Sequence, residues 1–519
     1  IQADHIHASP DGPWFFIIAR NNPHKKFLQL IGITDTSMLR PQVFALQDGD
    51  VQIGLICSEK QAIDATLQNL ASEDSRFCPV ADKYWNARGG SADDGGTFMF
   101  TVSDKADGTK KLVCTNKFGD VVQTPAHQTH HDTATLLGPT DQGDVIAQSV
   151  TRDLVDNLPG LQDFCRENMA TWDFAAVIHL VDTVTTAAQT GDDNAFAAIA
   201  LLTHLNDRRY ATGTKKRSSV LQILRDGLTR IFSGMPNFTQ PTKGAFRHID
   251  WKTREMLRAP RDAEKALVIN ARAFPPEGQA CDARLMCAAY QLGWQRFFCY
   301  GYKGQRFTGC GLAEGTDNVR IDVYDSSGDY LASGIDGLEI HVHGNAQDQL
   351  GQIMKRGKLV IHGDVGQTFM YGAKGGEVYV MGNAAGRPLI NAVGRPRVVI
   401  NGTCLDYLAE SFMAGDPLNG GGFVILNGMA FDDDGRVIPQ AIPYPGSNLF
   451  SLASGGAIYL RDPHQSAVPE QLNGGEFVDL TPDDWELIKP YLEENERLFG
   501  ISIEHDLLTI DGNLTDYTN

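Results

Sequence analysis

Short apolar runs recur at nearly constant spacing in the second half of the chain. The runs end at Asp325, Gly344, Gly363, Gly382, Gly402 and Gly428. The steps between these closing positions are 19, 19, 19, 20 and 26 residues. A period close to 20 residues is typical of solenoids, in which one short strand plus turns forms one coil. This repeat constrains the fold of the chain more than any other feature of the sequence.

The residues two and four positions before each closing residue are always apolar. They form two ladders, Val323, Val342, Ile361, Val380, Ile400 and Leu426, and Ile321, Ile340, Leu359, Val378, Val398 and Val424. Because side chains alternate between the faces of a strand, both ladders lie on one face, and stacked coils bury them as a continuous aliphatic core. The pattern predicts a parallel β-helix whose corner glycines adopt left-handed backbone. The L-x-x-L-x-L-x-x-N signature of the alternative, a leucine-rich horseshoe, is absent.

The upstream part divides into two regions of different periodicity. Residues 13–122 contain β-rich runs, whereas residues 128–235 carry apolar residues at helical spacing, which indicates a small helical domain. Pro236, Pro241 and Gly244 predict a linker that reaches about residue 262. Strands are expected at 13–19, 42–46, 51–56, 97–102, 266–270 and 296–300, and helices at 58–65, 172–181, 195–205, 219–231, 280–292 and 482–498. The last helix is expected to cap the open edge of the solenoid.

Charge and cysteine spacing exclude several classes of function. The 45 Lys and Arg residues against 64 Asp and Glu give a net charge of −19, which disfavours nucleic acid and anionic membrane surfaces as partners. The 9 cysteines show no C-x-x-C spacing, so we expect free thiols in a cytoplasmic protein, with no zinc ribbon or iron–sulfur cluster. Since the chain opens at Ile1 without a signal peptide, we expect it to be the remainder of a longer protein.

Several glycine-rich segments carry a family resemblance. They are residues 274–278, 304–309, 344–349, 366–376 and 401–407. Together they resemble the glycine-repeat C-terminal domain of the glutamate synthase large subunit, a right-handed parallel β-helix that is also similar to the β-helical chain of formylmethanofuran dehydrogenase. The resemblance covers about residues 265 to 505, including the helix at 484–498.

A second resemblance concerns the N-terminal region. Residues 35–41 (Asp-Thr-Ser-Met-Leu-Arg-Pro) and 57–59 (Cys-Ser-Glu) are similar to motifs of class II glutamine amidotransferase domains, which have the N-terminal-nucleophile fold. Met38 stands where that family has glycine, and Ile1 where the mature family has its catalytic cysteine. The region therefore resembles the C-terminal half of such a domain, and we expect no catalytic residue in this chain.

The predicted fold class is thus a multidomain α+β protein. Residues 1–125 are expected to form a partial glutamine amidotransferase-like α/β domain, 126–262 a helical domain and linker, 263–480 the right-handed parallel β-helix, and 481–519 a capping helix and tail.

The resemblance implies a subunit of a glutamate-synthase-like complex. Its role would be that of scaffold and ammonia-transfer part in the glutamine-dependent reductive amination of 2-oxoglutarate to glutamate. FMN and an iron–sulfur cluster are expected on a flavin-containing partner subunit, glutamine hydrolysis on a separate amidotransferase half, and an oligomeric assembly. No cofactor is expected in this chain. The alternatives are a β-helix scaffold of another redox complex, a self-assembling structural protein, and a glutaminase cut from a longer precursor with an N-terminal cysteine.

Two polar turns flanked by glycine are the candidate functional segments. Their residues are Asn345, Gln347, Asp348, Gln349, Gln367 and Thr368. Because they lie on consecutive coils, we expect them to line or rim a route for ammonia, or to contact the flavin subunit.

The remaining polar clusters favour structural interpretations. His343 and His362 precede corner glycines on adjacent coils, with His341 nearby, so their rings are expected to stack within about 5 Å at the surface without a metal. Other expectations are a solvated linker at His127, His130, His131 and Asp132, a hairpin turn at 432–435, a corner at 309–311, no nucleophile at Cys310 or Cys404, and a solvated basic helix end at 208–210 and 215–217.

Overall fold

The computed structural model describes residues 141–517 apart from 241–242, 303, 433 and 511, together with six strands upstream. The chain forms two compact units, residues 1–136 and 137–519, and each is considered by itself. The first unit contains antiparallel strands. They are β1 (Gln2–Ala8) with β2 (Phe15–Arg20), and the sheet β3 (Val43–Ala45), β4 (Val51–Leu55), β5 (Phe98–Asp104) and β6 (Lys110–Asn116).

The strands predicted in this unit are confirmed as β2 to β5. The amidotransferase-like segments at 35–41 and 57–59, the helix expected at 58–65 and the cluster from His127 to Asp132 lie outside the described residues.

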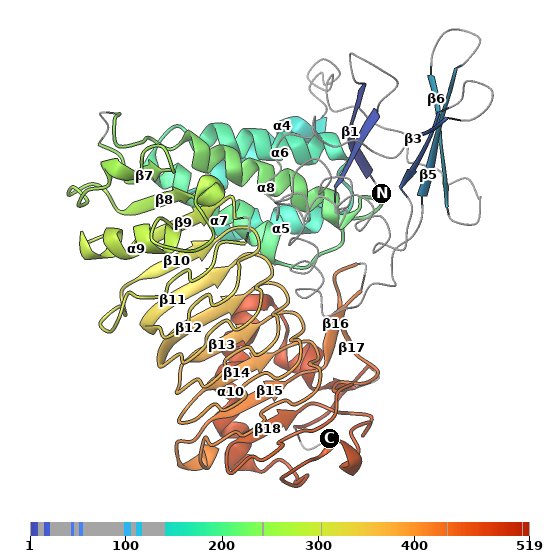
Figure 1. Cartoon of the computed structure of the whole chain (residues 1–519), viewed down its shortest axis with the longest axis vertical. Helices are drawn as coiled ribbons and strands as arrows, with labels where there is room; N and C mark the ends of the chain where they lie inside the picture. Colours follow the sequence, from blue (N-terminus) through green and yellow to red (C-terminus); the bar gives the residue numbers. More distant parts are fainter. Residues whose placement is uncertain are drawn as a thin grey trace. The chain divides into compact units, whose positions relative to one another are not determined.

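A ten-stranded parallel sheet organises the second unit (Figure 1). Its order is β18-β15-β14-β13-β12-β11-β10-β9-β8-β7, so nearly every strand pairs with its neighbour in the sequence. The strands are β7 (Phe246–Ile249), β8 (Ala266–Asn270), β9 (Arg296–Tyr300), β10 (Arg320–Val323), β11 (Asp336–Val342), β12 (Arg356–Ile361), β13 (Glu377–Val380), β14 (Arg397–Ile400), β15 (Phe423–Leu426) and β18 (Ala457–Leu460). The chain is a mixed α/β protein with a large parallel sheet.

The strand register confirms both predicted ladders. The predicted left-handed backbone of the corner glycines is confirmed at Gly428 but is wrong at Gly344, Gly363, Gly382 and Gly402, where a Cβ would instead collide with the preceding coil. Ile321 pairs with Ile340, which is also the partner of Leu359, and the same register continues to Val424. A second row of parallel bridges joins the turns that follow the strands, through Ser327, Ala346, Val365, Ala384 and Cys404. Buried side chains from beyond these turns, Leu331, Leu350, Phe369, Leu389 and Leu408, share one core with the ladders. The core therefore lies between the sheet and the opposite flank of the same coils.

The sheet extends beyond the predicted repeat at both ends. β7 lies inside the stretch predicted as a linker, and β18 adds a strand after the last predicted run. β7 was missed because its strand is only four residues long and follows Pro236, Pro241 and Gly244, yet Phe246 and Ile249 are fully buried. The strand–helix–strand unit of β8, α9 (Asp282–Gln291) and β9 is confirmed.

A layer of helices covers the outer face of the first strands. It consists of α4 (Asp141–Asp153), α5 (Leu158–Asn168), α6 (Phe174–Ala187), α7 (Asp192–Asp207) and α8 (Arg217–Gly234). The last three confirm the predicted helices, whereas α4 and α5 were not predicted. Phe232 of α8 stacks obliquely on Phe298, Tyr300 and Tyr324, so aromatic side chains on the outer face of β9 and β10 join the two layers.

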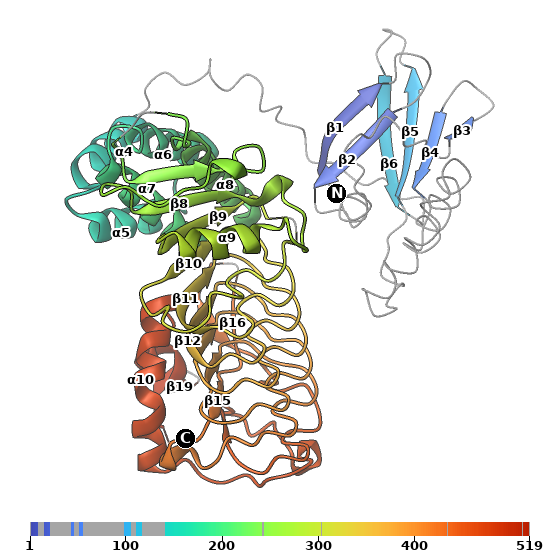
Figure 2. The same cartoon turned by 60° about the vertical axis from the view of Figure 1, so that its left-hand side comes forward.

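The prediction that the C-terminal helix caps the end of the stack is wrong. α10 (Pro482–Phe499) runs along the outer face of the sheet (Figure 2). Its Ile488 and Leu492 share a core with outward residues of successive strands, including Val360, Tyr379 and Val399. These strands carry apolar side chains on both faces, so the outer face also needs a cover.

Two smaller predictions are confirmed. β16 (Met429–Phe431) and β17 (Val437–Pro439) pair antiparallel, so residues 432–435 connect a hairpin, and Gly435 has a φ of 77°. The six cysteines within 141–517 are free. In the described part of the chain, no helix is both long and apolar enough to span a membrane.

Gly357, in β12, provides a test of the coil geometry. Its φ is 106°, and a Cβ there would lie 2.3 Å from the carbonyl oxygen of Leu338. Gly372 also has a positive φ, 59°, but a Cβ there would have nothing within 4 Å. We expect Gly372→Ala to cost about 1–2 kcal/mol of unfolding free energy from backbone strain alone, and Gly357→Ala clearly more. Urea denaturation measures both, and equal losses would contradict the close approach of the two strands.

Asp282, the first residue of α9, generates a pH prediction. It is fully buried, and neither carboxylate oxygen has a well-formed hydrogen bond. Burial raises its pKa from 3.8 to about 6, and the nearby Tyr302 hydroxyl opposes this only in part. The folded state therefore holds the proton more tightly than the unfolded state, and stability falls as pH rises from about 4 to 6, by roughly 3 kcal/mol.

The variant Asp282→Asn has no titrating carboxyl group at this position, so its stability lacks this pH dependence. Relative to the wild type, its unfolding free energy should improve by up to roughly 3 kcal/mol between pH 4 and pH 7. A difference between the two proteins that stays constant over this range would show that Asp282 titrates normally.

Candidate functional site

Titratable side chains converge where the end of α7 meets the outer face of β10, β11 and β12. Tyr324, His343 and His362 occupy the same position on successive coils, so their rings form a column. The ring centroids of Tyr324 and His343 lie 4.5 Å apart, and those of His343 and His362 lie 5.3 Å apart with an interplanar angle of 20°. The predicted stacking of the two imidazoles is confirmed.

The prediction that these histidines lie at the surface is wrong. The side chain of His343 is 3% exposed and that of His362 is 6% exposed. The end of α7 covers one side of the column, and Phe499 of α10 meets the His362 ring edge-on at a centroid distance of 5.2 Å. The repeat alone does not reveal this burial, because the covering residues Asp207 and Phe499 are more than 130 residues from the histidines in sequence.

His343 lies between two buried carboxylates. Its Nδ1 donates to Asp207 Oδ2 over 2.7 Å, and its Nε2 donates to Asp322 Oδ1 over 2.8 Å. Asn206 Nδ2 donates to Asp207 Oδ1 over 2.8 Å and thereby orients that carboxylate. On its other side Asp322 pairs with Arg296 and with Arg320. The last two residues of α7 are thus tied to the sheet through a histidine.

Burial and neighbouring charges together determine the protonation state of His343, Asp207 and Asp322. Burial alone would lower the pKa of His343, but Asp207 and Asp322 raise it to about 9. Burial alone would raise the pKa of Asp207, but the charge of His343 and the hydrogen bonds it receives lower it to about 2. Arg296 and His343 likewise hold the pKa of Asp322 well below its usual range despite burial. At neutral pH His343 is an imidazolium between two carboxylates.

The neighbouring histidines are held in the neutral form. Burial lowers the pKa of His362 to about 3, and its Nε2 lies 3.4 Å from Asp207 Oδ2. The Nδ1 atom of His362 is buried and has no hydrogen-bond partner. Burial also lowers the pKa of His341, although its Nε2 donates to Glu339 over 2.6 Å. His343, with both nitrogens donating, is no general base at neutral pH, whereas His362 retains a free lone pair.

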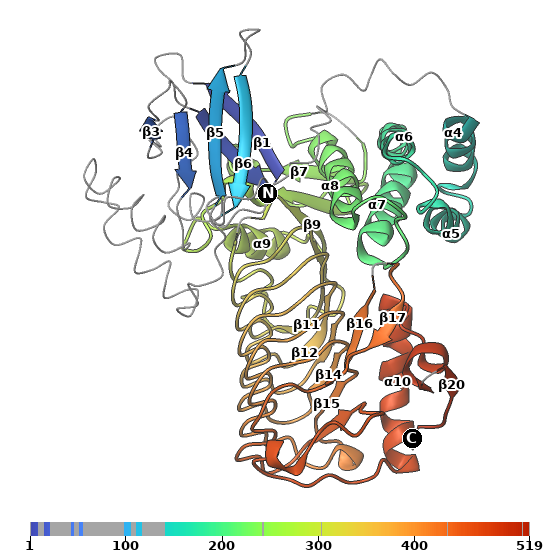
Figure 3. The same cartoon turned by 90° about the vertical axis from the view of Figure 1, so that its right-hand side faces the viewer.

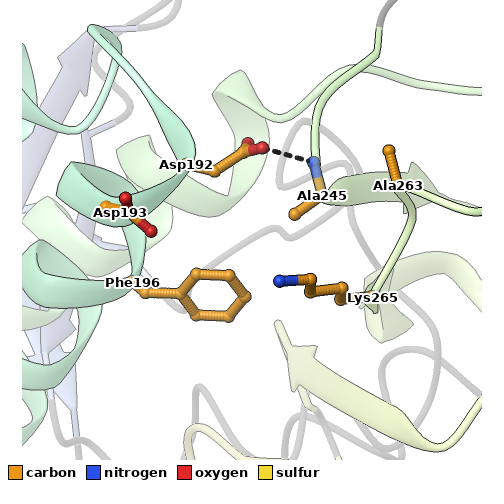
Figure 4. A pocket seen from close by; sticks show the side chains of 6 residues that line it. All are labelled: Asp192, Asp193, Phe196, Ala245, Ala263 and Lys265. Atoms are coloured by element: carbon orange, nitrogen blue, oxygen red, sulfur yellow. Dashed lines mark hydrogen bonds between the residues drawn. The ribbon is translucent and has the colours of Figure 1, made fainter.

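Two cavities lie on the helical layer. A cleft beside His343, bordered by Asn206 and Tyr324, has a volume of about 10 Å³, room for about one water molecule. A wider hollow of about 540 Å³ lies at the start of α7 (Figure 4). It is lined by Asp192, Asp193, Phe196, Ala245, Ala263 and Lys265. The Asp192 carboxylate in this hollow is already occupied, because it accepts a hydrogen bond from the Ala245 amide. The histidine cluster, with its strongly shifted pKa values, is therefore the better candidate for a functional site.

The polar turns predicted as functional segments lie next to each other on the rim of the stack. The Gln367 amide donates to Asp348 Oδ1 over 2.8 Å, and the Asp364 amide donates to Asn345 Oδ1 over 3.0 Å. Asn345 and Asp348 therefore bind one coil to the next. Their exposed neighbours are Gln347 and Gln367, with Gln349 and Thr368 partly buried.

The interior beneath these turns is filled. Val365, Leu350 and Phe369 are buried there in the shared aliphatic core. The turns are thus placed at the outer rim of the coils.

The remaining predicted features have the following positions. Residues 309–311 form a turn with both glycines at positive φ, as expected for a corner. Burial raises the pKa of the Cys310 thiol to about 12 and that of Cys404 further, so neither thiol is poised as a nucleophile.

The basic segment after α7 differs from its prediction as a solvated helix end. Lys215 is buried and donates to the carbonyl of Trp172, and the Arg208 guanidinium donates to the carbonyl of Arg497 in α10 over 2.6 Å. These side chains join helices that are distant in sequence.

Comparison with known families gives one match. A family model described as the GXGXG motif matches residues 301–517, and this motif occurs in glutamate synthase. No curated protein matches the sequence closely enough to indicate a relative.

The ion-paired histidine generates a stability prediction. Replacing His343 with Gln leaves Asp207 and Asp322 buried without their shared cation, so we expect a loss of about 3–5 kcal/mol of unfolding free energy. The exposed His505 is a matched control, and His505→Gln should change stability by less than about 0.5 kcal/mol. Urea denaturation at pH 7 compares them, and similar values for both variants would refute the role of His343.

Proposed function

We propose that this chain is the scaffold subunit of a glutamate-synthase-like complex, with a right-handed parallel β-helix at residues 263–480. One observation carries the proposal: the GXGXG match over residues 301–517 covers the stacked coils from β10 to β18. The function follows from the family in which this motif occurs.

The geometry of the coils supports the β-helix. Strands separated by about 19 residues pair in parallel, and a second row of bridges follows the same steps on another flank. The two flanks enclose one continuous apolar core. A solenoid of this kind offers long, rigid flanks, which suit it to holding other subunits in register.

The rim turns support a docking role more than an internal ammonia route. Leu350 and Phe369 occupy the interior beneath the turns, and both are fully buried. Gln347 and Gln367 are exposed on adjacent coils, where a flavin-containing subunit would meet them. We propose that ammonia passes along this contact, between the partner and the rim.

The redox groups fit the partner better than this chain. Between residues 141 and 517 the one group of potential metal ligands is Asp207, His343 and His362, and it contains no cysteine. An iron–sulfur cluster requires several cysteine thiolates at one place. In this proposal FMN and the cluster belong to the flavin subunit, and glutamine hydrolysis to a separate amidotransferase half.

Purification from the native source tests the assembly. We expect a flavoprotein to co-purify, with glutamine-dependent formation of glutamate in the same fraction. Co-purification of a molybdenum or tungsten protein instead, or filaments of this chain alone, would support the alternative of a scaffold for another assembly.

Substitution of the rim tests the role of the turns. In the assembled enzyme, Gln347→Leu with Gln349→Leu should lower glutamate formation several-fold relative to glutamine hydrolysis, because released ammonia escapes. The control is Gln189→Leu with Gln465→Leu, which removes two exposed glutamines elsewhere and should leave the ratio unchanged. Tight coupling in both double variants would exclude the rim as the transfer surface.

A further inference from the structure

We propose that Asp207, His343 and His362 form a binding site for one divalent transition-metal ion, with Zn²⁺ as the expected ion. Each residue offers one ligand atom, and the three atoms lie within 4.8 Å of one another. The site goes beyond the scaffold function, since it lies on the outer face of the sheet and not on the rim.

The distances are close to those of a coordination sphere. Tetrahedral Zn²⁺ with bonds of about 2.0–2.1 Å places neighbouring ligand atoms about 3.3–3.4 Å apart. The distance from Asp207 Oδ2 to His362 Nε2 is 3.4 Å, which already fits. The distance from Asp207 Oδ2 to His343 Nδ1 is 2.7 Å, so this pair must open by roughly 0.6 Å to admit an ion.

The surroundings supply the outer contacts that a metal-binding histidine needs. Metal-ligating histidines usually donate their second ring nitrogen to a carboxylate or carbonyl. His343 Nε2 donates to Asp322, which leaves Nδ1 for the ion. Asn206 holds the Oδ1 atom of Asp207, which leaves Oδ2 for the ion. Two of the three ligands, His343 and Asp207, are therefore already oriented by neighbouring groups, whereas His362 Nδ1 has no such partner.

The charge of the site also fits a cation. In the metal-free state a proton on His343 Nδ1 lies between the imidazole and Asp207. Metal coordination at Nδ1 releases that proton, so one positive group replaces another beside the same carboxylate. The released proton leaves to solvent, and Asp207 remains the counter-ion.

The donor set selects the class of ion. Two imidazoles and one carboxylate suit Zn²⁺, Co²⁺ and Ni²⁺, whereas Mg²⁺ and Ca²⁺ prefer oxygen ligands alone. In zinc sites with three protein ligands a water molecule completes the tetrahedron, and it would be the fourth ligand here. Since Asp207 comes from α7 and the histidines from the sheet, the ion would join the helical layer to the stacked coils.

Titration of the metal-free full chain tests the site. The protein is prepared without a polyhistidine tag, stripped with a chelator and titrated with Co²⁺, whose tetrahedral complexes absorb strongly in the visible range. Zn²⁺ binding is then measured by calorimetry. We expect one ion per chain, with the Co²⁺ spectrum displaced by Zn²⁺.

Variants assign the ligands. His362→Gln removes a neutral ligand and should weaken Zn²⁺ binding at least about 100-fold, and Asp207→Asn should do the same. The control is His341→Gln, a buried histidine on the same face whose ring nitrogen is held by Glu339, and it should retain the affinity within about 3-fold. Circular dichroism checks that each variant is folded.

Three results would overturn the proposal. They are a wild-type chain that takes up no Co²⁺ or Zn²⁺, a folded His362→Gln variant that binds as tightly as the wild type, and a His341→Gln variant that loses binding to the same degree. Since His362 makes no strong hydrogen bond, its variant remains a fair test if Asp207→Asn fails to fold.

Discussion

The in-register pairing of parallel strands is the constraint on which the rest of the second unit depends. A strand of four to seven residues buries too little apolar surface to be stable alone, and each coil here contributes one such strand. Stacking places Val323, Val342 and Ile361 in one column, so each coil completes the core of the next. A slip of one residue would turn every ladder side chain to the opposite face. The aliphatic ladders therefore set both the stability and the geometry of everything attached to the coils.

Two sets of helices share the outer face of the sheet (Figure 3). The histidine column lies where they meet, in contact with Asp207 of α7 and Phe499 of α10. Helices α7 and α8 cover the first strands, whereas α10 covers the later ones. At the junction, the Arg208 side chain reaches the end of α10, and the His362 ring contacts Phe499. The ion-paired His343 fastens α7 to the sheet at the same place. A polar, charged cluster is thus buried at a boundary between apolar layers, which is unusual for a site whose only role is packing.

The repeat in the sequence was sufficient to predict the ladders and their register, because a strict period leaves few alternative pairings. It also predicted the spacing of His343 and His362. It did not predict their burial, since this depends on Asp207 and Phe499, which approach through tertiary packing that no local pattern encodes. The same reason explains why the position of α10 was predicted wrongly. Its amphipathic pattern indicates that one face of the helix is buried, but not which surface of the protein it packs against. The apolar residues Tyr379, Val399 and Ile425 point away from the ladders, and they could have indicated that a helix packs on the outer face of the sheet.

The course of α10 has a consequence for how the protein loses its structure. In a simple solenoid each coil touches only its two neighbours, so the end coils fray one at a time. Here a single helix packs against outward residues of four strands, Val360 in β12, Tyr379 in β13, Val399 in β14 and Ile425 in β15. None of these coils can unfold without losing its apolar contacts with α10. Helix α10 thus couples the repeats to one another. We expect the coils along α10 to unfold together, in one all-or-none step.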